Sequence, residues 1–446
     1  MKPIPRRSVW RSAGLTCLCI VAVVHLARAQ SSASGPTGRV SIYANTAGRD
    51  FSDGARQRTT DLSTSVTLES PRTDDNGVEY GLDLRETRYS SAATPDRVSI
   101  YDGFAGASFG DDWRMRVRAG HMWLQDLGTM GALAGGLFEM GQRRSDDEGR
   151  FRVGAFSGLE PKLYETGYAS DVKKYGGYAA YERGFMQRHV IGYTTVTQGD
   201  LTERSVLSMT NFIPAGQRFF AYQAAEYETQ GPANGAVARG LSYFLTNARI
   251  TASSRVEVNA TYNRGRALDA RQLTADLING RALTAQALEG LKYESTGGRV
   301  TVEVIRRTYV YAGYTRDRNN RDDASTARML VGGHAGNIFG TGFDVSGSDS
   351  RIDRASGPYH ATYLSVGRTL GRAVYLSVDY STSLSVVRFF RSDGVAIETK
   401  PSTRRYSGSA STTLSRHVSL LGTLDYTIDD AMTEVRVLSG LSYRIH

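Results

Sequence analysis

Three arginine residues at alternate positions form the most distinctive group of charged side chains in this sequence. Arg114, Arg116 and Arg118 alternate with apolar residues in the segment 113–118, Trp-Arg-Met-Arg-Val-Arg. Successive side chains of a β-strand point to opposite faces, so a strand here would carry the three guanidinium groups on one face, about 7 Å apart. Inside a pore, such a row of cations would attract anions and screen out cations.

A second interpretation is structural, and the sequence leaves both open. Arg152 stands between the apolar residues Phe151 and Val153, so it extends the basic character to a nearby strand. The arginines could instead pair with acids such as Glu79 and Asp83 and brace the wall. The arginines could also do both, attracting anions and pairing with acids, which would set up an electric field across a constriction of the pore. The favoured solutes would then be anions or sugar acids.

The candidate inward face is polar on several strands. In the segment 61–69 Leu62, Val66 and Leu68 share one face, and Asp61 lies on the other. Buried charge without a partner costs several kcal/mol or more, so a face this polar indicates a water-filled lumen. The predicted lumen-lining residues are Asp61, Glu79, Asp83, Arg85, Arg114, Arg116, Arg118 and Arg152.

No catalytic, metal or cofactor site is predicted, and we do not expect an enzyme. The histidines after the N-terminal segment are scattered: His121, His189, His334, His360, His417 and His446. None stands in a recognisable constellation of nucleophile, base and orienting group. His121, with Asp126 close by, is the best candidate for a site at the rim, against an ordinary solvated loop histidine.

The elements that would position these residues are clearest at the C-terminus. Between Val418 and Ile428 apolar residues occupy every second position, and the turn 429–432 reverses the chain. The returning segment 433–445 alternates in the same way. The pattern predicts a hairpin of long strands, apolar on one side and polar on the other, and favours a transmembrane β-barrel.

The last strand resembles the closing strand of bacterial outer-membrane β-barrel proteins of the porin-like kind. The segment 441–445, Leu-Ser-Tyr-Arg-Ile, fits the alternation of that signal, but Ile445 stands where an aromatic residue is expected, and His446 follows it. The resemblance implies recognition by the barrel-assembly machinery through the C-terminal strand. It also implies outer-membrane lipid and lipopolysaccharide as surroundings, in the Gram-negative cell envelope.

The N-terminus predicts export. A basic region with Lys2, Arg6 and Arg7 precedes an apolar run, and Ala27-Arg28-Ala29 matches a signal-peptidase site, so residues 1–29 are predicted to be a cleaved signal peptide. Removing the five basic residues of this segment lowers the formal net charge from +9 to +4. Cys17 and Cys19, the only cysteines, are removed with it. No basic stretch is interleaved with aromatic residues, so nucleic acid is not an expected partner.

The predicted fold is all-β: an antiparallel up-and-down transmembrane barrel of about 22 strands. Short turns and longer connections alternate along residues 30–446, which we assign to one domain. The weakest strand patterns are 132–142 and 326–348, and losing one or two hairpins would give 20 or 18 strands.

The segment 265–294 breaks the alternation. Leu273, Leu277 and Ile278 have helical spacing, and Gly280 would divide the segment into two short helices. We expect a partly helical loop insertion that covers the rim; the alternative is a loop that folds inward and narrows the pore.

The preferred function is a water-filled outer-membrane channel for the diffusion of small polar, and on one interpretation anionic, solutes. The alternative is a structural or export barrel that docks another envelope component. Association into homo-oligomers is compatible with either function.

Overall fold

The computed structural model describes residues 35–445 apart from 71–75, 92–93, 143–148, 162–166, 185, 323, 355, 372 and 391–395. The predicted signal peptide lies outside these residues. Twenty-two long strands form one sheet: β1 (Thr37–Phe51), β2 (Arg56–Glu69), β3 (Gly77–Tyr89), β4 (Arg97–Phe109), β5 (Trp113–Trp123), β6 (Ala132–Gln142), β7 (Arg150–Pro161), β8 (Tyr168–Arg183), β9 (Gln187–Gln198), β10 (Leu201–Ala215), β11 (Phe219–Gln230), β12 (Gly240–Ser253), β13 (Val256–Ala267), β14 (Leu291–Ile305), β15 (Thr308–Asn319), β16 (Thr326–Ala335), β17 (Phe343–Asp353), β18 (Tyr359–Leu370), β19 (Val374–Ser385), β22 (Ser402–Thr413), β23 (Val418–Asp429) and β24 (Met432–Ile445).

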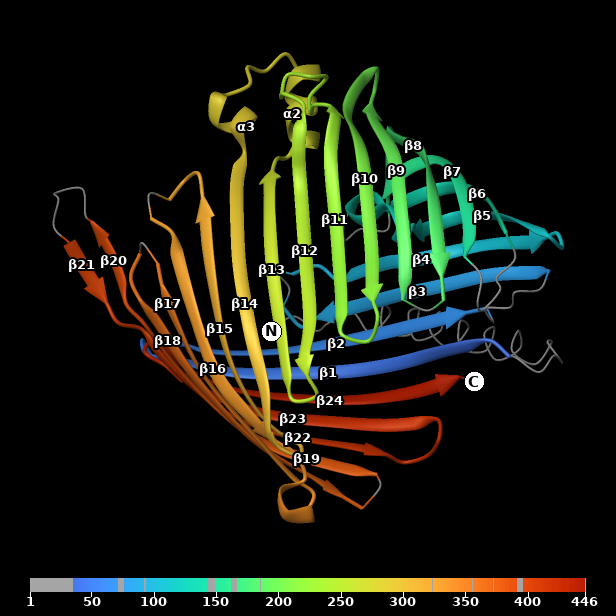
Figure 1. The fold of residues 1–446 in the computed structure, drawn as a ribbon. Helices are drawn as coiled ribbons and strands as arrows, with labels where there is room; N and C mark the ends of the chain where they lie inside the picture. The colour runs from blue at the N-terminus through green and yellow to red at the C-terminus, as the bar shows by residue number, and fades with distance from the viewer. Residues whose placement is uncertain are drawn as a thin grey trace, which may run out of the picture.

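Every strand pairs antiparallel with the next one along the chain, and β1 pairs with β24, so the sheet closes into a barrel (Figure 1). The prediction of a closed up-and-down barrel of about 22 strands is confirmed. The two segments with weak strand patterns are included: 132–142 is β6, and 326–348 supplies β16 and the first half of β17. The hairpin of β20 (Val387–Phe390) and β21 (Ala396–Thr399) forms a separate two-stranded sheet in the connection between β19 and β22.

The two ends of the barrel differ in their connections. At one end, which we call the short-turn rim, the links are as short as Arg306-Arg307; at the other, the long-loop rim, they include 231–239 and 268–290. The loop 268–290 carries the helices α2 (Ala270–Ile278) and α3 (Ala285–Glu289), which stand above the rim in Figure 1. No helix in the described part of the chain combines the length and hydropathy needed to cross a membrane.

Strand pairing separates two faces of the wall. Val40 lies opposite Tyr443, and Ile42 opposite Leu441, so the exposed apolar residues of neighbouring strands share the outward face. The residues between them face inward, including Ser41 opposite Ser442. A one-residue slip would exchange the two faces, so the apolar pattern fixes the register.

Outward aromatic residues mark two levels of the barrel. Near the long-loop rim they are Trp123, Tyr175, Tyr193, Tyr227, Tyr262, Tyr314, Tyr380, Tyr406 and Tyr426. Near the short-turn rim they are Phe109, Trp113, Phe151, Phe343 and Tyr443. Aliphatic residues occupy most outward positions between these levels, such as Val300, Val378 and Leu424. Two aromatic girdles around an apolar band are typical of barrels embedded in a lipid bilayer.

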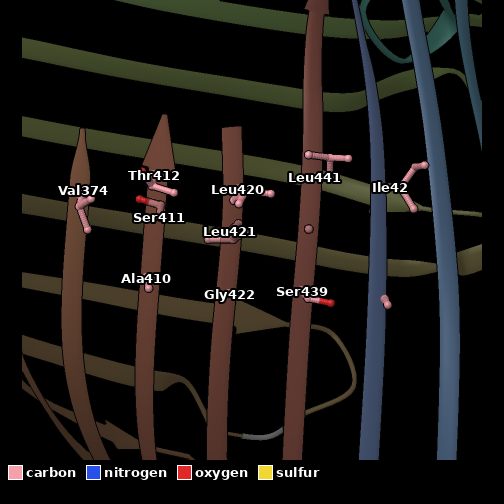
Figure 2. Close-up of a pocket in the computed structure, with 12 residues that line it drawn as sticks. Ile42, Val374, Ala410, Ser411, Thr412, Leu420, Leu421, Gly422, Ser439 and Leu441 are labelled. Atoms are coloured by element: carbon pink, nitrogen blue, oxygen red, sulfur yellow. The ribbon is translucent and has the colours of Figure 1, made fainter. Parts of the chain in front are cut away.

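A shallow groove runs across the outward face where the barrel closes. Ala44, Ser439, Gly422 and Ala410 lie side by side on β1, β24, β23 and β22. Bulkier residues, among them Ile42, Leu441, Leu420 and Val374, border this row of small residues (Figure 2). The groove is therefore a dip in the apolar outer surface and opens away from the lumen.

On the inward face, aromatic rings lie over glycines of the neighbouring strand. An ideal Cβ added to Gly440 would lie 2.5 Å from the ring of Tyr43, and one added to Gly332 would lie 2.5 Å from the ring of Tyr311. The same arrangement joins Gly81 with Phe104, Gly154 with Tyr178, Gly265 with Tyr293 and Gly367 with Tyr375. A ring covering a cross-strand glycine packs well and keeps the wall thin.

Candidate functional site

The three arginines of β5 face inward and converge on one carboxylate. Glu79 Oε1 accepts hydrogen bonds from Arg116 Nε at 3.0 Å and from Arg114 Nη2 at 3.5 Å. Its Oε2 accepts from Arg118 Nε at 2.9 Å and Nη2 at 2.6 Å. Glu79 is only 8% exposed. The row predicted from the sequence is present, but its side chains are gathered onto Glu79 and do not stand free in the lumen.

A second acid, Glu139 on β6, joins this group to the next strands. It pairs with Arg116 at 3.0 Å and with Arg152 of β7 at 2.5 Å, and it accepts the hydroxyl of Tyr178 from β8. Arg152 is central, since it also bonds Asp126 at 2.8 Å and Glu182 at 2.9 Å.

The network continues along the wall to β9. Glu182 also binds Arg150 at 2.6 Å, and Arg188 pairs with Asp126 and lies 3.4 Å from Glu182. Six guanidinium groups therefore meet four carboxylates, which leaves a net charge of +2. The members are Arg114, Arg116, Arg118, Arg150, Arg152 and Arg188 with Glu79, Asp126, Glu139 and Glu182. We call them the charged wall.

Asp126 reaches this network because the loop 124–131 folds into the barrel. The loop includes the short helix η1 (Gln125–Met130), whose Leu127 and Met130 are almost fully buried. Leu127 packs against Gly192 on the inward face of β9. Further inward apolar residues surround it: Met122, Leu133, Leu137, Phe156, Val172, Val190, Val196 and Val206. We call residues 124–131 the inward loop.

Lys174 of β8 pins the inward loop from the wall. Its Nζ donates to the carbonyl oxygens of Met130 at 3.3 Å and Ala132 at 2.9 Å, and it lies 3.6 Å from Glu160. The side chain is 2% exposed. Apolar packing and ionic contacts thus hold the inward loop on one side of the lumen, where it narrows the passage.

The opposite wall carries many small hydroxyl side chains, together with the ion pairs Arg405–Asp425 and Arg436–Glu434. Inward serines on β17 to β19 and β22 to β24 include Ser346, Ser348, Ser365, Ser381, Ser383, Ser411 and Ser419. Ser377 and Ser409 lie 2.7 Å apart, and Ser407 donates to Asp425 at 2.6 Å. The lumen is therefore bounded by the charged wall on one side and by a hydroxyl wall on the other.

The remaining predicted lumen residues also lie on the inward face but outside the charged wall. Asp61 lies opposite Asn45, Asp83 lies opposite Asp102, and Arg85 stands 5.3 Å from the ring of Tyr101. Sequence reasoning missed Asp126, Glu139, Glu182 and Arg188. The alternation of β6, β8 and β9 could have identified the last three, whereas no local pattern placed Asp126 inside the barrel.

The predicted rim site at His121 does not form. Strand pairing places His121 on the outward face of β5, 6.2 Å from the ring of Tyr168, while Asp126 turns inward to Arg152 and Arg188. His121 is a strand residue, so the alternative of a solvated loop histidine is wrong as well. Within the described residues, no group of three or more histidine, cysteine or acidic side chains is arranged to hold a metal ion.

The partly helical segment lies at the long-loop rim above β7 to β10. Leu273 of α2 packs with Ala233 and Val237 from the loop 231–239. Arg271 binds Glu203 at 2.6 Å and Glu160 at 3.1 Å, and these carboxylates hold the pKa of its guanidinium above its ordinary value. The helices therefore form a cover fixed to the sector of the rim above the inward loop.

No protein-family model matches the chain, and no curated protein matches it. Similar solved structures include OccAB2 of Acinetobacter baumannii (8% identity, 92% of this chain and 98% of that chain, TM-score 0.43). OpdQ of Pseudomonas aeruginosa is also similar (8% identity, 92% and 99% coverage, TM-score 0.40). A third is the translocation pore of the P pilus usher PapC (12% identity, 92% and 100% coverage, TM-score 0.46). At these identities and TM-scores the comparisons assign no family to this chain.

Proposed function

We propose that this protein spans the outer membrane of a Gram-negative envelope as a water-filled channel for the diffusion of small polar solutes. The observation that carries the proposal is the contrast between the two faces of the wall. The outward face is an apolar band between aromatic girdles, whereas the inward face carries hydroxyl and ionic side chains. Such an arrangement is stable when lipid lies outside and water inside.

The size of the barrel supports a wet lumen. With strands about 4.8 Å apart and tilted by about 40°, 22 strands close into a cylinder roughly 40 Å across between backbones. Facing side chains are too short to meet across such a width. The inward loop fills one sector, and the solute path would pass between it and the hydroxyl wall.

The lining suggests solutes that exchange hydrogen bonds with hydroxyl and guanidinium groups. Most charges of the charged wall are paired, so the residual +2 would give a moderate preference for anions and would still admit neutral and cationic solutes. The arginines would then have both roles: their ion pairs brace the barrel wall, and their residual positive charge makes the lumen more favourable to anions.

Export through a cleaved signal peptide, with the mature chain starting near Gln30, belongs to this proposal. The short-turn rim would face the periplasm and the long-loop rim the exterior, as in other outer-membrane barrels. The C-terminal strand β24 would be the segment that the barrel-assembly machinery recognises. The channel would work without a cofactor and without catalysis.

Conductance in planar bilayers tests the channel. Purified protein, inserted at low concentration in 1 M KCl, is expected to give discrete conductance steps, and a reversal potential in a KCl gradient should show a modest preference for chloride. A correctly folded, heat-modifiable barrel that gives no steps at any voltage would count against the channel and in favour of the export or docking barrel.

A further inference from the structure

A set of arginines on the outward face remains outside this function. At the long-loop end of β13, β15, β17 and β22 they are Arg264, Arg316, Arg318, Arg351 and Arg404, and all five are exposed. We call them the outer arginine collar. None faces the lumen, so channel selectivity does not account for them.

Strand alternation and pairing place the collar at a defined level. Arg264, Arg316 and Arg404 each lie two positions beyond an outward tyrosine of the same strand, toward the long-loop rim. These tyrosines are Tyr262, Tyr314 and Tyr406 of the outer aromatic girdle. Because girdle aromatics sit at the boundary between acyl chains and headgroups, the collar lies at the height of the lipid headgroups.

The guanidinium groups of the collar are largely unpaired. Among the described residues, no carboxylate lies within ion-pair distance of Arg264, Arg318 or Arg404, and Arg316 donates to a hydroxyl, Ser325 Oγ, at 3.2 Å. Arg351 lies 3.7 Å from Asp349, with 73% of its side chain exposed. The arginines of the charged wall differ, since each of those binds a carboxylate.

The acids on this face do not neutralise the collar. Glu294 lies between Arg264 and Arg318 in the strand pairing and accepts the hydroxyl of Tyr262 at 3.2 Å. Asp349 accepts from His360 and Thr362, and Asp353 lies at the end of β17. Five arginines therefore stand beside three acids.

The opposite end of the same strands is different. Outward positions of β13 to β22 near the short-turn rim are mainly apolar, such as Val258, Val302 and Leu376. The cation there, Arg368, lies 4.6 Å from the ring of Phe343. On outward strand positions the cationic character thus belongs to the long-loop end, which would face the outer leaflet. The arginines of the same strands at the short-turn rim, Arg255, Arg306 and Arg307, lie in turns beyond the strand ends.

We infer that the outer arginine collar binds phosphate groups on the headgroups of outer-leaflet lipids. Guanidinium groups bind phosphate oxygens through paired hydrogen bonds. A lipid whose acyl chains lie on the apolar band would place its phosphates at the collar without reorientation. The inference rests on the membrane-spanning part of the proposed function and is independent of whether solutes pass through the lumen.

Lipid binding by the full mature chain in neutral detergent micelles tests the inference. The probes are diphosphorylated lipid A and the same lipid A with its phosphates removed, and native mass spectrometry counts the bound lipid. The variant is the triple substitution Arg264→Gln, Arg316→Gln and Arg404→Gln. The matched control is Arg405→Gln, which changes the next residue of β22, an inward arginine bonded to Asp425 at 2.9 Å.

We expect the triple variant to bind the diphosphorylated lipid roughly a hundredfold more weakly than the unmodified protein, since each of the three arginines near an anionic lipid surface contributes about fivefold. The Arg405→Gln control should bind it normally, and the phosphate-free lipid should bind all three proteins weakly and equally. Equal affinity of the triple variant, or equal binding of both lipids, would overturn the inference.

Three further measurements keep the outcome decisive. Retained heat-modifiability of the triple variant shows that it folds, and inorganic phosphate at the lipid concentration should displace nothing. Displacement by inorganic phosphate would assign the collar to free anions and reject the lipid. Bilayer conductance of the same samples separates this result from the channel proposal. If the triple variant loses lipid binding and conducts as before, the substitutions act on the collar alone and leave the channel intact.

Discussion

Glu79 is the residue on which the electrostatics of the charged wall depend most directly. One carboxylate accepts hydrogen bonds from three guanidinium groups of a single strand, and all four side chains are largely withdrawn from water. Charges in such a setting are tolerated because they are paired and hydrogen-bonded. The same pairing reduces the field that a passing ion would feel.

Replacing this carboxylate by an amide separates the two roles of the arginines. Glu79→Gln raises the net charge of the charged wall from +2 to +3, so the chloride-to-potassium permeability ratio should rise roughly twofold, as for a unit charge acting at about 10 Å in water. The reversal potential in a KCl gradient at 0.1 M salt measures the ratio. The effect should shrink at 1 M salt, where the Debye length is about 3 Å.

The substitution Arg116→Gln is the opposite control, since it lowers the same charge to +1 and should shift the ratio toward potassium. Glu79→Gln should also destabilise the barrel by about 3 kcal/mol, because three poorly hydrated cations lose the carboxylate that they share. Equal selectivity of the two variants would show that the charged wall does not face the ion path.

At the scale of elements, the inward loop links the wall to the lumen. Its apolar residues pack on the inward face of β8 to β10. Asp126 adds ion pairs, and Lys174 adds hydrogen bonds to the carbonyl oxygens of Met130 and Ala132. An inward apolar cluster is unusual in a polar lumen, and its position explains why β6 and β8 carry buried leucine and valine where alternation predicts polar residues.

Shortening the inward loop should widen the channel. A variant with residues 125–130 replaced by two glycines loses the insert but keeps β5 and β6, so its unitary conductance should exceed that of the unmodified protein. The measurement is the step size in 1 M KCl. Shortening the rim loop 281–284 serves as the control and should leave the step size unchanged; identical steps in all three proteins would contradict the assigned position of the constriction.

The glycine and tyrosine pairs define how closely neighbouring strands and rings pack. Gly440→Val should lower the free energy of unfolding by about 1–3 kcal/mol, because its side chain would overlap the ring of Tyr43 at the closing pair of strands. Urea titration in lipid vesicles measures the loss. Gly48→Val on β1 is the matched control, since nothing lies within 4 Å of its added Cβ, and equal losses would contradict the packing explanation.

The whole molecule is a cylinder with different ends. The long-loop rim carries the helices and the outer arginine collar. The short-turn rim carries connections of at most seven residues, among them 336–342, where Phe339 is 98% exposed. This asymmetry predicts a single orientation in the membrane.

Cysteine labelling tests that orientation. Gln286→Cys on α3 and Phe339→Cys on the short-turn rim place single exposed thiols at opposite ends, and Cys17 and Cys19 are the only native cysteines. A membrane-impermeant maleimide should label Gln286→Cys in intact cells and Phe339→Cys only after the outer membrane is permeabilised. The reverse pattern would invert the assignment of the rims.

The sequence by itself determined the class of fold, the strand count and the two faces of the wall, because each follows from a period of two that is written locally in every strand. The inward direction of Arg114, Arg116, Arg118 and Arg152 followed from the same period. Only the tertiary structure decided which acids these arginines meet, because Glu139, Glu182 and Arg188 come from other strands brought together by closure. It alone placed Asp126 inside, since a loop has no period from which its direction could be read. The outward direction of His121 follows instead from the alternation of β5, in phase with Trp113, Met115 and Val117.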